Sequence, residues 1–301
     1  MKTLFHEIFD EAQIGLPSFG KLNELLRKAS EEKLRPAAED EKKVLFLAID
    51  MQNDFMERGE LGVPGSHQDV ARAARFLYRH LETITQVAVS LDTHQPLQIF
   101  HPCWWTDAEG NHPAPLTIIT RDDVRQGKWR AVVHQQESLA YVTHLEQQSK
   151  KELCIWPYHC LEGSFGAALE SQFARMVFFH SLARKSTPLR IVKGKEPLSE
   201  MYGIFKPEHG PYSEEQRGLL NRLREYDRIL IAGEAKSHCV LESLGQMLEY
   251  YADDKEFTSR IVVLEDCMSS IPGFEEQTEQ AFAKWKDDYG ITVAASADIS
   301  L

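Results

Sequence analysis

The chain has 301 residues, of which 43% are hydrophobic and 27% are charged, a composition typical of a globular protein with a large buried core. Lys and Arg number 34 against 46 Asp and Glu, which gives a formal net charge of -12. Because nucleic-acid binding depends on clustered Lys and Arg, this charge argues against a nucleic-acid partner. The length allows one large α/β domain with insertions, or two modest domains.

The five cysteines do not suggest a disulfide framework. They are Cys103, Cys154, Cys160, Cys239 and Cys267, an odd number without a Cys-x-x-Cys pair. In a chain of this size, that pattern favours a reducing compartment. The N-terminal segment MKTLFHEIFDEAQIG is interrupted by charge and lacks the apolar core of a signal peptide. No apolar run near a strand is long enough to cross a bilayer, so we expect a cytoplasmic protein without a membrane partner.

The N-terminal 42 residues differ from the rest of the chain in their pattern of apolar and polar residues. Residues 1 to about 34 repeat apolar side chains at helical spacing. Residues 35–43 are polar, contain Pro36 and are typical of a linker. We therefore expect residues 1–42 to form a helical extension and linker, followed by the main domain at residues 43–301.

From residue 43 onward, short apolar runs alternate with helical patterns. The runs predict buried strands at Lys43–Asp50, Gln86–Asp92, Leu189–Lys193, Arg228–Gly233, Arg260–Glu265 and Ile291–Ala294. Apolar stripes at helical spacing lie at residues 69–85, 238–251 and 275–288. This alternation predicts an α/β fold with a doubly wound, mainly parallel six-stranded sheet and helices on both faces. Two long stretches, 101–152 and 195–213, interrupt it, and loops of such length usually form lids or interfaces.

Three chemically active side chains stand where predicted strands end. Asp50 ends the first strand, Lys193 ends the third, and Cys239 opens the helix that follows the fourth. Ligands bind at the carboxyl ends of the strands in such sheets, so the three groups can meet in one crevice. A lysine and a helix N-terminus favour the thiolate, and a carboxylate can take and return protons. A lone cysteine is more often structural, but this combination predicts a nucleophile.

Three segments that contain these residues resemble the motifs of one known family. The segment Asp50–Phe55 (DMQNDF) resembles the opening motif of the nicotinamidase and isochorismatase-like cysteine hydrolases. Lys193–Gly194 resembles the lysine and glycine of that family, and Gly233–Val240 (GEAKSHCV) resembles its nucleophile motif. The similarity covers about residues 43–301, with an insertion at about 102–152.

The resemblance implies the isochorismatase-like hydrolase fold and a covalent mechanism. Asp50 and Lys193 would assist Cys239, which attacks an amide carbon and forms a thioester. The backbone N–H groups of Ala235 and Cys239 would hold the oxyanion. The family also implies a cis peptide between Glu234 and Ala235.

A second set of residues resembles the metal site of nicotinamidases. Asp92 and His94 form an Asp-x-His pair after the second strand, and His159 lies in the segment WPYHC, which resembles the Trp-Pro-x-His-Cys segment of the family. These side chains suit a divalent ion, zinc first, with manganese or iron as alternatives. His101 is a further candidate ligand, because some relatives place a His or Glu at about this distance.

The resemblance implies that Phe55, Trp156 and Tyr202 stack on the ring of the substrate. We expect deamination of nicotinamide to nicotinate, which would feed NAD recycling, by a protein that forms a homo-oligomer. The alternatives are another amidase of the superfamily, such as a carbamoyl-amine or ureido-acid hydrolase, and a non-catalytic binding protein on the same fold. Isochorismatase activity fits less well, because it needs neither the cysteine nor the metal.

Overall fold

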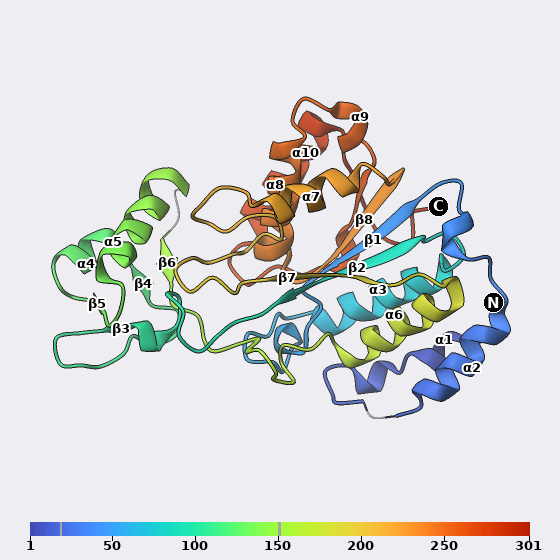
Figure 1. Ribbon diagram of the computed structural model, residues 1–301, viewed down its shortest axis with the longest axis horizontal. Coiled ribbons are helices and arrows are strands. Elements are labelled where there is room, and N and C mark those ends of the chain that lie inside the picture. The colour runs from blue at the N-terminus through green and yellow to red at the C-terminus, as the bar shows by residue number, and fades with distance from the viewer. Residues whose placement is uncertain (19, 150–151) are drawn as a thin grey trace.

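A six-stranded sheet forms the centre of the computed structural model, which describes residues 1–18, 20–149 and 152–301 (Figure 1). All neighbouring strands are parallel, in the order β10-β9-β8-β1-β2-β7. The strands are β1 (Val44–Ile49), β2 (Gln86–Asp92), β7 (Leu189–Lys193), β8 (Arg228–Gly233), β9 (Ile261–Leu264) and β10 (Thr292–Ala294). The predicted fold class is confirmed, and each predicted strand agrees with the structure to within one residue at either end.

The central strand β1 shows why a continuous apolar run predicts this sheet. All six of its residues are buried, because β8 and β2 flank it and helices cover both of its faces. Leu45, Leu47 and Ile49 face one apolar layer, while Phe46 and Ala48 face the other. Side chains alternate between the two faces of a strand, so an apolar residue is needed at every position.

Helices from different parts of the chain form the two layers. The helices α3 (Ser66–Arg79) and α6 (Ser171–Arg184) cover one face. The other face is covered by α7 (Glu214–Leu223), α8 (Leu241–Tyr250), α9 (Lys255–Thr258) and α10 (Glu275–Tyr289). The helix α6 has no apolar stripe in the sequence because it is buried on several sides. The sheet lies on one side of it and the N-terminal helices pack on another (Figure 1).

The N-terminal extension is a packed part of this layer. Its helices, α1 (Phe5–Ile8) and α2 (Leu22–Glu32), are shorter than the predicted helical region, and they pack against α6. The predicted linker is fixed by Asp40, whose carboxylate binds the guanidinium of Arg184 at 2.6 Å. Both side chains are buried, and the Thr85 hydroxyl also donates to Asp40 at 2.8 Å.

The insertion forms a small lobe beside the sheet, at the left of Figure 1. It contains the two-residue strands β3 (Trp105–Thr106), β4 (Ile118–Ile119), β5 (Arg130–Ala131) and β6 (Leu153–Cys154) and the helices α4 (Arg121–Arg125) and α5 (Gln135–His144). The strands pair as β3 with β5 and β4 with β6, both antiparallel. Trp104, Trp105 and Tyr141 are buried in an apolar cluster that belongs to the lobe.

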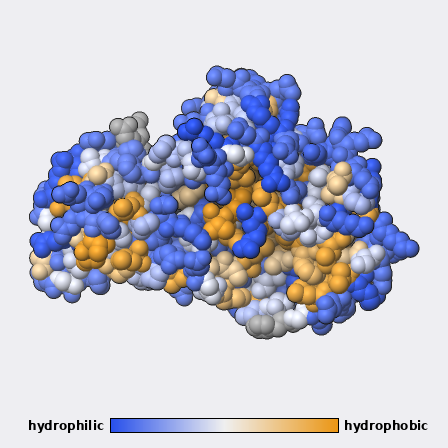
Figure 2. All heavy atoms as spheres, in the orientation of Figure 1, coloured by the Kyte–Doolittle hydropathy of each residue, from blue (hydrophilic) through white to orange (hydrophobic). Residues whose placement is uncertain are grey.

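The edge strand β7 is covered mainly where it carries Lys193. Of its five residues only Lys193 is buried, and Val192 is 45% exposed. Figure 2 shows hydrophobic surface over the middle of this view, where β7 runs in Figure 1.

Within the described part of the chain, none of the helices has both the length and the apolar character needed to span a membrane.

Replacement of Asp40 by Ala should strongly destabilise the fold, because the Arg184 guanidinium would stay buried without its counter-charge. The expected loss is about 3–5 kcal/mol in the free energy of unfolding, measured by urea denaturation. Glu31→Ala is the matched control, since it breaks an exposed ion pair with Arg27 and should cost under about 1 kcal/mol. Equal losses in the two variants would contradict the buried role of Asp40.

Candidate active site and metal site

The sheet brings Asp50, Lys193 and Cys239 together at the carboxyl ends of its strands. Asp50 directly follows β1 with a left-handed φ of 47°. The Ser90 hydroxyl of β2 fixes this turn, because it accepts from Asp50 N at 2.9 Å and donates to Asp50 Oδ1 at 2.6 Å. Cys239 lies in the helical turn Lys236–Val240, which follows β8 and leads into α8.

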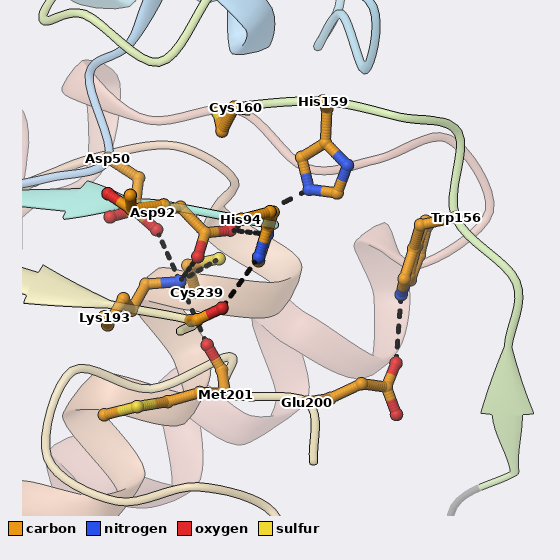
Figure 3. Close-up of polar contacts among 12 residues, drawn as sticks. Asp50, Asp92, His94, Trp156, His159, Cys160, Lys193, Glu200, Met201 and Cys239 are labelled. Carbon is orange, nitrogen blue, oxygen red and sulfur yellow. Dashed lines mark hydrogen bonds and ion pairs between the residues drawn. The ribbon is translucent and has the colours of Figure 1, made fainter. Parts of the chain in front are cut away.

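Lys193 is the centre of the cluster (Figure 3). Its Nζ lies 3.0 Å from Asp50 Oδ2 and 3.7 Å from Cys239 Sγ. It also lies 3.2 Å from Asp92 Oδ1 and donates to the carbonyl oxygen of Met201 at 3.0 Å. The predicted acid–base group, cation and thiol are therefore in contact through one ammonium group.

Burial and these charges shift the pKa values of Lys193 and Cys239. Burial alone would lower the pKa of Lys193, but Asp50 and Asp92 outweigh it and raise that pKa well above its usual value. Burial raises the pKa of the Cys239 thiol well above its usual value; Lys193 opposes this rise and the two carboxylates add to it. The sequence shows the lysine that favours the thiolate, but neither the burial nor the second carboxylate that oppose it.

Asp50 is placed to take the proton from this thiol. Burial raises the pKa of Asp50 and Lys193 opposes the rise. A carboxylate with increased proton affinity beside a buried thiol can act as a general base when substrate arrives.

A second cluster lies beside the first. Atoms of Asp92, His94 and His159 that can bind a metal lie within 4.8 Å of one another, and all three side chains are buried. His94 Nε2 is 2.9 Å from Asp92 Oδ2, and His159 Nε2 is 3.8 Å from the same oxygen. The Nδ1 atoms face the carbonyl oxygens of Gly194 at 3.0 Å and Pro157 at 2.8 Å.

These contacts fit a metal site. When Nδ1–H donates to a carbonyl group, the lone pair of Nε2 is left to bind a metal. Burial would raise the pKa of Asp92, but His94 and Lys193 hold it well below its usual range, which favours the ionised form that binds a metal. One carboxylate and two imidazoles suit zinc and other first-row divalent ions.

His101 is not brought into this group of atoms. Its ring centroid lies 5.9 Å from that of His94, and its Nδ1 is 3.1 Å from the carbonyl oxygen of Pro96. Burial lowers its pKa to about 3, so the ring is neutral. Its Nε2 is buried without a hydrogen-bond partner among the described residues. The local chain places His101 at the start of the short helical turn Pro102–Trp104, which sets its distance from the cluster.

Three motif residues hold the two clusters in place, namely Gln52, Asp54 and Gly194. The Gln52 amide donates to Asp92 O and accepts from Asp92 N, both at 2.7 Å. Asp54 Oδ2 accepts from the backbone N–H of Cys160 at 2.6 Å, which fixes the segment that carries His159. A Cβ at position 194 would lie 2.4 Å from Asp92 Oδ1, so this position requires glycine.

Both clusters open into one pocket of about 510 Å³, a volume that includes its mouth. Phe55, Trp156 and Tyr202, the predicted ring-binding residues, line it. Cys239 and Ala235 also line it, so the two expected oxyanion donors belong to the same pocket. The Glu234–Ala235 peptide is cis, as predicted.

Ser90 and Glu200 belong to the site although no motif marks them. Ser90 lies inside an apolar strand, where the sequence gives no sign of its bond to Asp50. Glu200 lies in the long segment between β7 and α7, yet it is buried and lines the pocket. Only the contacts across the sheet and across the pocket reveal either residue.

The fold, a parallel α/β sheet with polar side chains gathered at the carboxyl ends of its strands, is similar to that of solved nicotinamidase structures. A nicotinamidase and pyrazinamidase from Acinetobacter baumannii matches with a TM-score of 0.57 and 18% identity, over 86% of this chain and 99% of that chain. The yeast nicotinamidase Pnc1p bound to nicotinaldehyde matches with a TM-score of 0.57 and 18% identity, over 84% and 99% of the two chains. At this identity the likeness establishes the fold. No family model and no curated sequence matches the chain.

His94→Ala should lose high-affinity binding of one divalent ion, because it removes one of three buried candidate ligands. We expect zinc affinity to fall at least about tenfold, measured by calorimetry on protein first stripped with a chelator. The affinity of the unaltered protein should itself fall with acidification, because both imidazoles must be neutral to bind. His112→Ala is the control, since His112 lies outside the cluster. Unchanged zinc binding in His94→Ala would refute this site.

Proposed function

We propose that this protein is a metal-binding cysteine amidohydrolase that converts nicotinamide to nicotinate and ammonia. The observation that carries the proposal is the position of Lys193, whose ammonium group contacts both Asp50 and Cys239 beside an aromatic pocket. The arrangement gives a nucleophile, a base and a fixed cation within one desolvated cluster, as covalent catalysis requires. The shared fold with nicotinamidase structures is consistent with this activity.

In the first half of the reaction Asp50 takes the proton of the Cys239 thiol, and Lys193 stabilises the thiolate that results. The sulfur attacks the carboxamide carbon, and the backbone N–H groups of Ala235 and Cys239 stabilise the oxyanion. Asp50 returns the proton to the nitrogen, the C–N bond breaks, and ammonia leaves. The product at this stage is a thioester on Cys239.

In the second half, water attacks the thioester while Asp50 takes its proton. The C–S bond breaks, the proton on Asp50 returns to Cys239, and nicotinic acid leaves and ionises to nicotinate in solvent. Asp92, His94 and His159 would hold the divalent ion, with zinc as the first candidate. Such an ion supplies a Lewis-acid position for the ring nitrogen of the substrate.

The pocket lining favours an aromatic amide over the carbamoyl and ureido alternatives. Phe55, Trp156, Tyr202 and His238 present rings to the pocket, and rings stack on a pyridine with a gain of about 0.5–1.5 kcal/mol beyond burial. A ureido acid carries a carboxylate that needs a cationic partner. Among the described residues, no Lys or Arg side chain lines the pocket. Nicotinamide is therefore the better fit, and a ureido acid is the second candidate.

Cys239→Ala should abolish turnover, because it removes the attacking atom and little volume. We expect ammonia release from nicotinamide to fall by more than about 10³-fold while the melting temperature stays close to that of the unaltered protein. Cys103→Ala is the control, since Cys103 lies outside the pocket, and it should keep its activity. A Cys239→Ala variant with substantial turnover would exclude the covalent mechanism.

The choice of substrate is tested separately by ammonia release from a panel of amides. Nicotinamide and pyrazinamide should both be deaminated by the zinc-loaded protein, because each presents a carboxamide on a nitrogen-containing ring. An N-carbamoyl amino acid should react poorly, because it has no ring to stack on the aromatic wall and no Lys or Arg lines the described pocket to bind its carboxylate. The reverse ranking would replace nicotinamidase with the ureido-acid alternative.

A further inference from the structure

The wall of the pocket contains a carboxyl group that the mechanism does not use. Glu200 lies on the segment between β7 and α7, and it is 3% exposed. Its Oε1 accepts from Trp156 Nε1 at 3.0 Å and from the Tyr202 hydroxyl (Figure 3 shows the first contact). A single carboxylate oxygen thus binds the polar atoms of two rings that line the pocket.

The shared acceptor, Glu200 Oε1, fixes the relative orientation of the Trp156 and Tyr202 rings. The ring centroids of Trp156 and Tyr202 are 6.3 Å apart, with an interplanar angle of 83°. Trp156 Nε1 also lies 3.2 Å from the Tyr202 hydroxyl, so three polar atoms form one compact group. An indole N–H and a phenol O–H require partners when buried, so the acceptor restricts the rotation of both rings.

The insertion holds Glu200 from the other side. Tyr141, on α5 of the lobe, donates its hydroxyl to Glu200 Oε2 at 3.0 Å. The same hydroxyl accepts from the backbone N–H of Glu200 at 2.9 Å. Tyr141 is itself buried in the core of the lobe, so it is a rigid support. The insertion is thereby connected to the pocket wall through this carboxylate.

Burial of the Glu200 carboxyl group costs free energy, and this cost points to a functional role. Burial raises the pKa of Glu200 to about 7, although Tyr202, Trp156 and Tyr141 oppose the rise with hydrogen bonds. Nearby Glu208 adds to the rise. A buried carboxyl group in a pocket, kept despite its desolvation, is a candidate functional group.

We propose that Glu200 is a positioning residue for the substrate ring: it sets the orientation of Trp156 and Tyr202, and Tyr141 of the insertion holds it in place. The inference rests on the proposed function, because the positioned ring is that of the proposed substrate. It assigns a role to the insertion, namely to support the pocket wall from outside the sheet.

The test compares Glu200→Ala and Glu200→Gln with Glu196→Ala, whose exposed carboxylate lies on the same segment outside the pocket. Glu200→Ala should raise KM for nicotinamide about tenfold, because Trp156 and Tyr202 lose their shared acceptor, with kcat changed far less. Glu200→Gln keeps an acceptor oxygen and should restore KM to within a few-fold. Glu196→Ala should leave both constants unchanged. Tyr141→Phe should give a smaller rise in KM, and it carries the test if Glu200→Ala fails to fold.

A second readout does not depend on turnover. In protein labelled with ¹⁵N-tryptophan, the indole N–H resonance of Trp156, assigned with Trp156→Phe, should move in Glu200→Ala and move much less in Glu200→Gln. An unchanged KM in Glu200→Ala, or a Glu200→Gln variant no better than Glu200→Ala, would overturn the positioning role. If the unaltered protein releases no ammonia from nicotinamide, the proposed function fails and the ring-positioning role falls with it. An active protein whose variants keep its KM overturns the positioning role alone.

Discussion

The buried ammonium group of Lys193 is the constraint on which the site depends. Removal of such a charge from water costs several kcal/mol, and only close counter-charges offset that cost. Asp50 and Asp92 supply them from the ends of the two neighbouring strands, at 3.0 and 3.2 Å. Because the same ammonium group also contacts Cys239, the proposed nucleophile and the candidate metal-ligand cluster share one electrostatic centre. A change in the charge of either cluster must therefore alter the other.

The parallel sheet creates this centre through its register. Asp92 on β2 and Lys193 on β7 are direct partners in the sheet. Asp50 follows β1, which pairs with the other edge of β2. Gln52 then binds the backbone of Asp92 on both sides, which prevents the two strand ends from separating. A shift of one residue would turn these side chains to the opposite face and leave charges buried in the apolar layers. The conformation of the strand ends is therefore as important as the identity of the reacting groups.

The surroundings of the pocket come from segments distant in the sequence. His159 and Trp156 follow the insertion lobe, and the backbone N–H of His94 binds the carbonyl oxygen of Cys160 at 2.9 Å. The path of the chain through the lobe thus determines one pocket wall and one candidate metal ligand together. The N-terminal helices act at a greater distance, since they cover α6 and complete the apolar layer behind the sheet.

The sequence by itself determined the strands, because a strand buried on both faces must be apolar at every position. It also placed Asp50, Lys193 and Cys239 at strand ends, where a parallel sheet collects polar groups. It did not reveal α6, whose burial on several sides removes the apolar stripe by which a surface helix is recognised. The burial that raises the pKa of the Cys239 thiol, the position of His101 outside the Asp92–His94–His159 group and the contacts of Glu200 were decided only by the tertiary structure. Each depends on burial, on the local path of the chain or on partners from distant segments, and these are properties of the packed fold that sequence spacing does not contain.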